Sequence, residues 1–245
     1  MPDQPRISPP ALASRWVLGM GLVSWRYLWA TMPLHRTERR VDAPELPPPI
    51  PTELSREELQ PWESGAGPMF HRLFRIRIKE AHKDAAGLMH TVIDDMGSLV
   101  PAEVVHVHEG DASDRRLRPG DEIVVDMPGP WNGPVRVVAA EPTRLHLATL
   151  DGHLEAGQIE FRAYDEPPHL VFEVEAWARP ATRAVHVLYS HLRLAKEIQF
   201  NMWVRFCQAA AKDAGGRPDG GVEIRTTVTP VPDPARPDRQ PGGAA

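Results

Sequence analysis

The stretch that most constrains the fold is a run of 32 residues without proline or glycine near the end of the chain, residues 182–213. Apolar side chains recur in it at steps of three and four, the spacing of one helix face. They are Val185, Leu188, Leu192, Ala195, Met202, Trp203, Phe206 and Ala210. Gly215 and Gly216 then predict the end of the helix. Gln199 falls near the middle of this apolar stripe, so its amide needs a hydrogen-bond partner inside the protein or on a ligand.

Patterns of alternating residues, typical of half-buried strands, precede this helix. In residues 70–79, Phe74, Ile76 and Ile78 face one way, and the basic residues between them face the other. Residues 82–95 have helical spacing instead. Further short strands are predicted at 104–108, 122–127, 135–140, 145–150, 158–164, 170–177 and 221–228. The pairs Asn132-Gly133 and Asp151-Gly152 are predicted to form hairpin turns.

The chain divides into four predicted parts. Residues 1–36 contain an apolar helix at 11–32, and residues 37–64 form a proline-rich linker with a short helix capped by Ser55. Residues 65–229 form the folded domain, and residues 230–245 a disordered proline-rich tail. The fold class is α+β: a curved antiparallel sheet wrapped around a long C-terminal helix.

Composition limits the function classes. A net charge of −5 gives no support for nucleic-acid binding. A single cysteine, Cys207, excludes an internal disulfide and a cysteine-based zinc site, which fits a cytoplasmic protein. Basic residues are nearly all arginine, which indicates a GC-rich bacterial genome. The apolar run at 16–25 is about half the length of a membrane-spanning helix. The tryptophan-rich helix at 11–32 either packs on the domain, lies on a membrane surface or forms a dimer contact.

Two stretches carry a family resemblance. Residues 149–161 (TLDGHLEAGQIEF) and 172–180 (FEVEAWARP) resemble a bacterial family of domains of unknown function. That family belongs to the START-like superfamily, also called SRPBCC or Bet v 1-like. Its motif reads Gly-His-Pro-Glu…Gly-Glu-x-x-Phe, followed by an aromatic residue and Ser-Arg-Pro. Here Leu154 replaces the proline, and Ala178 replaces the serine.

The resemblance covers about residues 65–215 and implies the helix-grip fold. It also implies a hydrophobic ligand between sheet and helix, and no particular activity. We expect no cofactor and no metal. The residues expected to contact the ligand are Phe74, Ile76, Val125, Trp131, Leu147, Phe161, Phe172, Leu192, Gln199, Met202 and Phe206, with Val137 and Val174 beside them.

Two other functions stay open. A cyclase- or hydrolase-like enzyme would need a titratable group in the cavity, and His146 and His191 are the nearest candidates. An interaction protein would instead use the helix at 11–32. The chain has no phosphate-binding loop, Gly-x-Ser-x-Gly turn or His-Glu-x-x-His helix, so no recognisable catalytic motif supports an enzyme.

The remaining polar candidates favour structural roles. His106 and His108, with acidic residues beside them, could bind a metal, but an exposed strand end explains them better. Glu173 and Glu175 lie opposite the apolar face of their strand, so they are predicted to face solvent. Cys207 is predicted to be an unreactive packed residue. His153 either holds the hairpin at Asp151-Gly152 or lies at the mouth of the cavity.

Overall fold

The computed structural model describes residues 33–54, 58–99, 106–109, 116–126, 132–183 and 193–231. It describes only the backbone of residues 106–109, 125, 126, 132 and 193–199. The predicted helix at 11–32, the Ser55 cap and the tail from residue 232 lie outside these ranges. None of the described helices is long and apolar enough to cross a membrane.

The described strands form a single sheet in the order β1-β9-β2-β8-β7-β6-β5-β4-β3. Neighbouring strands are antiparallel except β1 and β9, which are parallel. The strands are β1 (Leu34–Arg40), β2 (Met69–Lys79), β3 (His106–Glu109), β4 (Glu122–Asp126), β5 (Asn132–Glu141), β6 (Arg144–Thr149), β7 (Glu155–Glu166), β8 (His169–Pro180) and β9 (Arg217–Thr229). The predicted strands are therefore present, with β1 in addition.

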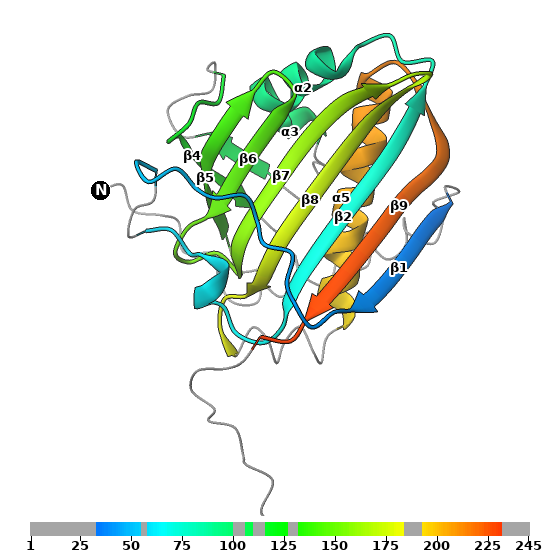
Figure 1. The fold of residues 1–245 in the computed structure, drawn as a ribbon. Coiled ribbons are helices and arrows are strands. Elements are labelled where there is room, and N and C mark those ends of the chain that lie inside the picture. The colour runs from blue at the N-terminus through cyan, green and yellow to red at the C-terminus, as the bar shows by residue number, and fades with distance from the viewer. Residues whose placement is uncertain are drawn as a thin grey trace, which may run out of the picture.

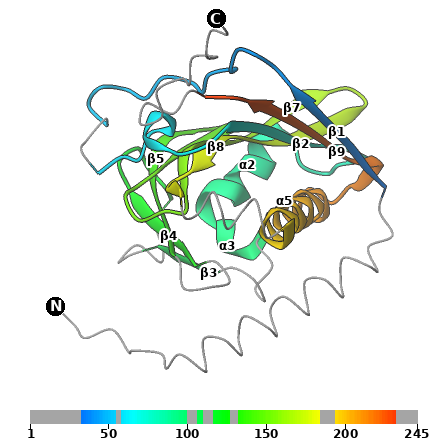
Figure 2. The same ribbon diagram turned by 90° about the horizontal axis from the view of Figure 1, so that it is seen from below.

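The helices lie on one side of this curved sheet, which we call the inner face (Figures 1 and 2). They are α2 (Ala85–Asp94), α3 (Met96–Leu99) and α5 (Arg193–Asp213). α2 packs against β6, β7 and β8, and α5 packs against β2, β8 and β9. The opposite side, the outer face, bears the 3-10 turn η1 (Trp62–Ser64) and the segment that leads to it. The molecule is thus a large, mostly antiparallel curved sheet with few helices.

The end of α5 follows the predicted glycine signal. Gly215 has a φ of 70°, and its N–H donates to the carbonyl of Lys212. The N–H of Gly216 donates to the carbonyl of Ala211, which completes a Schellman motif. The chain then enters β9 immediately, at Arg217.

The described part of the segment before β2 lies along the sheet. β1 pairs with β9 from Leu34 to Arg40, so it crosses the boundary expected at residue 36. Residues 41–54 and 58–68, here called the strap, then run over the outer face (Figures 1 and 2). The Gln60 N–H donates to the carbonyl of Thr149 at 2.8 Å, and its side-chain amide donates to the carbonyls of His153 and Glu155.

The two predicted hairpin turns have different outcomes. Asp151 and Gly152 form a turn between β6 and β7, and Gly152 has the positive φ of 94° that glycine tolerates. Asn132 and Gly133 instead lie within β5, opposite Asp126 and Val125 of β4. The prediction of a turn at Asn132-Gly133 was therefore wrong, because pairing with β4 extends β5 to residue 132.

Candidate functional site

The inner face of the sheet forms an apolar wall against α5. On β2, β6, β7 and β8, every second residue points to this face and is buried in the core, together with Phe206 of α5. The predicted site residues in this core are Phe74, Ile76, Leu147, Phe161, Phe172 and Phe206, with Val137 and Val174 beside them. The structure therefore brings these predicted positions together in one apolar core on the inner face, which α2 and α5 cover.

Aromatic rings fill the described part of this layer. Phe206 lies with its ring centroid 5.3 Å from Phe161 and 5.9 Å from Phe172, both on the sheet. Trp203, one turn earlier on α5, approaches Phe161 edge-on at 5.7 Å. Phe200 lies 5.7 Å from Phe74. From Phe200 onward along α5, helix and sheet are therefore in direct contact.

The other predicted site residues are less well placed. Met202 on α5 is half-buried. Val125 lies on β4 and Gln199 on α5, but the structure describes only the backbone of each. Trp131 and Leu192 lie outside the described residues.

A buried charged side chain, Arg72, belongs to the inner face, and the prediction missed it. Arg72 is buried and shares the parity of Phe74 on β2. Its guanidinium carbon lies 4.8 Å from the ring centroid of Phe70 and 5.5 Å from that of Phe200. Glu155 of β7 lies 3.6 Å from its Nη1. The alternation along β2 was a signal for Arg72, because it places residue 72 on the same side as residues 74 and 76.

Cys207 is buried in α5. Burial raises the pKa of its thiol, so the thiolate that acts as a nucleophile is suppressed. A packed, unreactive role agrees with this environment.

The outer face carries a buried ionic network, which corrects the prediction that Glu173 and Glu175 face solvent. The Glu173 side chain is only 1% exposed. It accepts hydrogen bonds from Arg75, from Arg162 at 2.6 Å and from Tyr164 at 3.1 Å. Long cationic and aromatic side chains on neighbouring strands therefore cover the Glu173 carboxylate. The alternation along the strand had predicted only that Glu173 faces away from the core.

Arg162 is the centre of this network. Its guanidinium contacts Glu173, Glu175 at 2.7 Å and Glu160 at 3.2 Å. Burial alone would lower the pKa of Arg162, but the charges of Glu173 and Glu175 outweigh it and raise the pKa. Burial and the charge of Glu173 raise the pKa of Tyr164. The arrangement holds fixed charges in place and leaves Tyr164 a hydrogen-bond donor.

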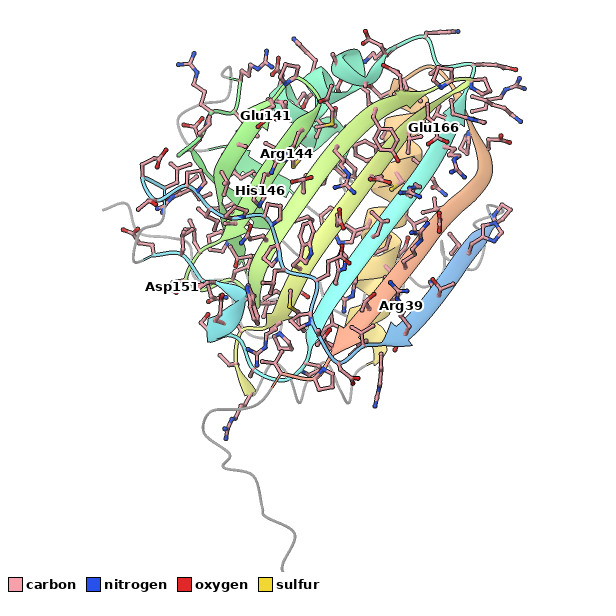
Figure 3. The ribbon with its side chains drawn as sticks, in the orientation of Figure 1. Arg39, Glu141, Arg144, His146, Asp151 and Glu166 are labelled. Atoms are coloured by element: carbon pink, nitrogen blue, oxygen red, sulfur yellow. The ribbon has the colours of Figure 1, made fainter. Side chains whose placement is uncertain are left out.

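His146, one of the two histidines expected nearest the cavity, is a packed residue of the outer face. Figure 3 shows His146 on β6, with Arg144 of the same strand, on the outer face. The His146 Nε2 lies 2.7 Å from Gln158 Oε1, and burial lowers the pKa of His146. His146 is therefore far from the cavity expected beside α5, which lies on the inner face. His191 lies outside the described residues.

His153 holds the hairpin between β6 and β7. Its Nδ1 accepts a hydrogen bond from the Glu155 N–H at 2.9 Å. Burial lowers the pKa of His153, which keeps the ring neutral and able to accept. This supports the structural interpretation of His153.

An open groove of about 340 Å³ lies on the outer face beside β1. It is lined by His35, Thr37, Arg75, Arg77, Asp219, Gly220, Gly221 and Glu223. Arg75 is paired with Glu173, and Arg77 lies 3.4 Å from Glu166. The groove therefore presents both signs of charge, with its arginines already in ion pairs.

Comparisons with known proteins give distant likenesses. None of the proteins with curated descriptions matches the chain. Among solved structures, the KanY protein has 8% identity and a TM-score of 0.45, over 62% of this chain and 99% of its own. The di-domain ARO/CYC StfQ from the steffimycin biosynthetic pathway has 11% identity and a TM-score of 0.44, over 63% and 52%. Major latex-like protein 151 from Panax ginseng has 13% identity and a TM-score of 0.35, over 54% and 95%.

At these TM-scores, the structural likenesses carry no argument about function. The family comparison covers a shorter part of the chain. Residues 98–210, which include both stretches that carry the resemblance, match the family model described as Domain of unknown function (DUF1990).

Proposed function

We propose that this START-like protein binds a hydrophobic small molecule between the inner face of the sheet and α5, in the helix-grip arrangement. The observation that carries the proposal is the inner wall, whose buried side chains are mostly apolar and aromatic, with Arg72 and Thr226 as buried polar groups among them. Small-molecule sites in proteins have this composition, with a few placed polar groups among apolar ones. The family resemblance implies the same kind of ligand.

The ligand is proposed to lie beside Met202, toward the start of α5. Phe206 and Trp203 already fill the layer near the second half through contacts with Phe161. Met202 is half-buried, and Gln199 precedes it by almost one turn of helix. The predicted contacts at Val125, Trp131, Leu192 and Gln199 belong to the same proposal.

The test is native mass spectrometry of the purified full chain, followed by titration with the apolar fluorophore 1-anilinonaphthalene-8-sulfonate. We expect a co-purifying small molecule or a saturable probe site. Met202→Trp should weaken probe binding at least tenfold by filling the site. The matched control is Thr37→Trp, which adds the same ring to the outer groove and should leave binding unchanged.

Two results would contradict the proposal. One is a clean apo mass together with no saturable probe binding. The other is a loss of binding in Thr37→Trp but not in Met202→Trp, which would place the ligand in the outer groove.

The alternative functions are less supported. A cyclase- or hydrolase-like enzyme loses one candidate group, because His146 lies on the outer face. A cytoplasmic location stays a proposal. So does a contact of residues 11–32 with a membrane surface or a second copy of the chain.

A further inference from the structure

A cluster of side chains that could bind a metal ion lies on the outer face, beside the strap. It brings together Glu45 of the strap, His71 of β2 and Glu175 of β8. One ligand atom from each residue lies within 4.8 Å of the other two. An imidazole and carboxylates at this separation form a donor set that divalent metal ions use. The cluster is on the face opposite α5, so it is independent of the proposed ligand site.

The hydrogen bond to Glu175 orients the imidazole. The His71 Nε2 lies 2.7 Å from Glu175 Oε1. With Nε2 held by this carboxylate, Nδ1 is the nitrogen left to face a metal ion. In protein metal sites, a histidine ligand usually donates the hydrogen of its other ring nitrogen to a carboxylate or carbonyl.

The other nitrogen of His71 lacks a hydrogen bond. Nδ1 is buried and has no hydrogen-bond partner among the described residues, although Glu45 Oε2 lies 3.3 Å away. Two ligands on a tetrahedral zinc ion, with bonds of about 2.0–2.1 Å, lie roughly 3.3 Å apart. The separation of Nδ1 and Oε2 thus fits two atoms that share one ion.

The ring is also held rigidly. Trp177 of β8 stacks on His71 with centroids 5.1 Å apart and planes 6° from parallel. The His71 side chain is only 12% exposed, whereas that of Glu45 is 67% exposed. A rigidly held imidazole therefore lies beside an accessible carboxylate.

We propose that His71 Nδ1 and Glu45 bind a divalent zinc ion, with Glu175 positioning the imidazole. One imidazole and one carboxylate suit zinc better than magnesium or calcium, which prefer oxygen ligands alone. The bound ion joins the strap to β2.

The test is isothermal titration of the full chain with zinc chloride at neutral pH. We expect one zinc ion per chain at this site, and Glu45→Gln should weaken its binding at least tenfold. Glu53→Gln is the matched control, because it removes another exposed strap carboxylate and should change nothing. A His106→Gln/His108→Gln variant removes the competing pair of histidines and should also bind zinc as the wild type does.

His71→Gln, checked for folding by circular dichroism, should lose the same site. Cobalt titration should give the visible absorption of a nitrogen- and oxygen-ligated ion in the wild type and lose it in Glu45→Gln. The proposal is overturned if the wild type takes up no zinc, which would leave His71 a plain hydrogen-bonding residue. It is also overturned if Glu45→Gln binds zinc as tightly as the wild type, or if only the His106→Gln/His108→Gln variant loses the ion.

Discussion

Replacing Arg162 with methionine should destabilise the fold strongly, because it removes one cation from three buried carboxylates. Glu173, Glu175 and Glu160 have side chains that are 1%, 9% and 5% exposed. Removing one partner of a buried ion pair costs about 3–5 kcal/mol. Arg162 is itself 33% exposed and Glu173 keeps its bond from Arg75, so we expect the lower end, about 3 kcal/mol. That is on the order of a hundredfold in the unfolding equilibrium.

The assay is equilibrium unfolding in urea, which does not screen charges as guanidinium chloride does. The matched control is Arg217→Met, since Arg217 and Glu80 form an ion pair with side chains 69% and 62% exposed. Exposed pairs contribute about 0–1 kcal/mol. Equal free energies of unfolding for Arg162→Met and Arg217→Met would refute the reasoning. They would mean that the network is solvated despite its burial.

The pH dependence of the free energy of unfolding tests the same ionic network independently. The pKa of Glu175 is lowered in the folded protein. Its contribution to the free energy of unfolding is therefore fully present above the ordinary glutamate value of about 4.3 and is lost as pH falls through the folded value. Arg162→Met removes one cause of that lowering. The difference between wild type and variant should be largest at neutral pH and shrink below about pH 4.

Two further predictions concern the core. Cys207 should not react with a thiol reagent such as 5,5′-dithiobis(2-nitrobenzoate) in the native protein and should react fully in urea, because burial raises its pKa; rapid labelling of the native chain would contradict this. Gly157→Ala should cost at least about 3 kcal/mol, the upper end of overpacking, because the new Cβ would lie 1.9 Å from the Trp177 carbonyl oxygen. The control Gly97→Ala, with no neighbouring atom closer than 3.9 Å, should be nearly neutral in the same urea unfolding, and equal effects would argue against the steric cause.

The strands and the helix end were predictable because their signals are local. Alternation placed Phe74 and Ile76 on the buried side of β2, and the glycines after Asp213 marked the end of α5. β1 was not predictable in the same way. Its sequence, LHRTERR, has no apolar alternation, and its only described sheet neighbour is β9, far along the chain.

The candidate site was predictable in its apolar part and not in its polar part. The alternation of side chains shows which residues share a face of a strand, but it does not show what covers that face. Glu173 and Glu175 were therefore predicted to face solvent, whereas neighbouring side chains bury them. The strap was predicted to be part of a linker because prolines favour an extended chain. An extended chain can also lie flat along a sheet, and the sequence does not distinguish the two.

The pairing of β1 with β9 also bears on how the chain folds during synthesis. The His35 Nε2–H donates a hydrogen bond to the carbonyl of Gly220, 185 residues away. The first described strand therefore pairs only after the last one has left the ribosome. Contacts so distant in sequence slow folding, since the loop between them must close first. Until then β2 is an unprotected edge strand, open to pairing with other chains. The charged residues of β1 then form the finished edge of the sheet, which discourages that pairing.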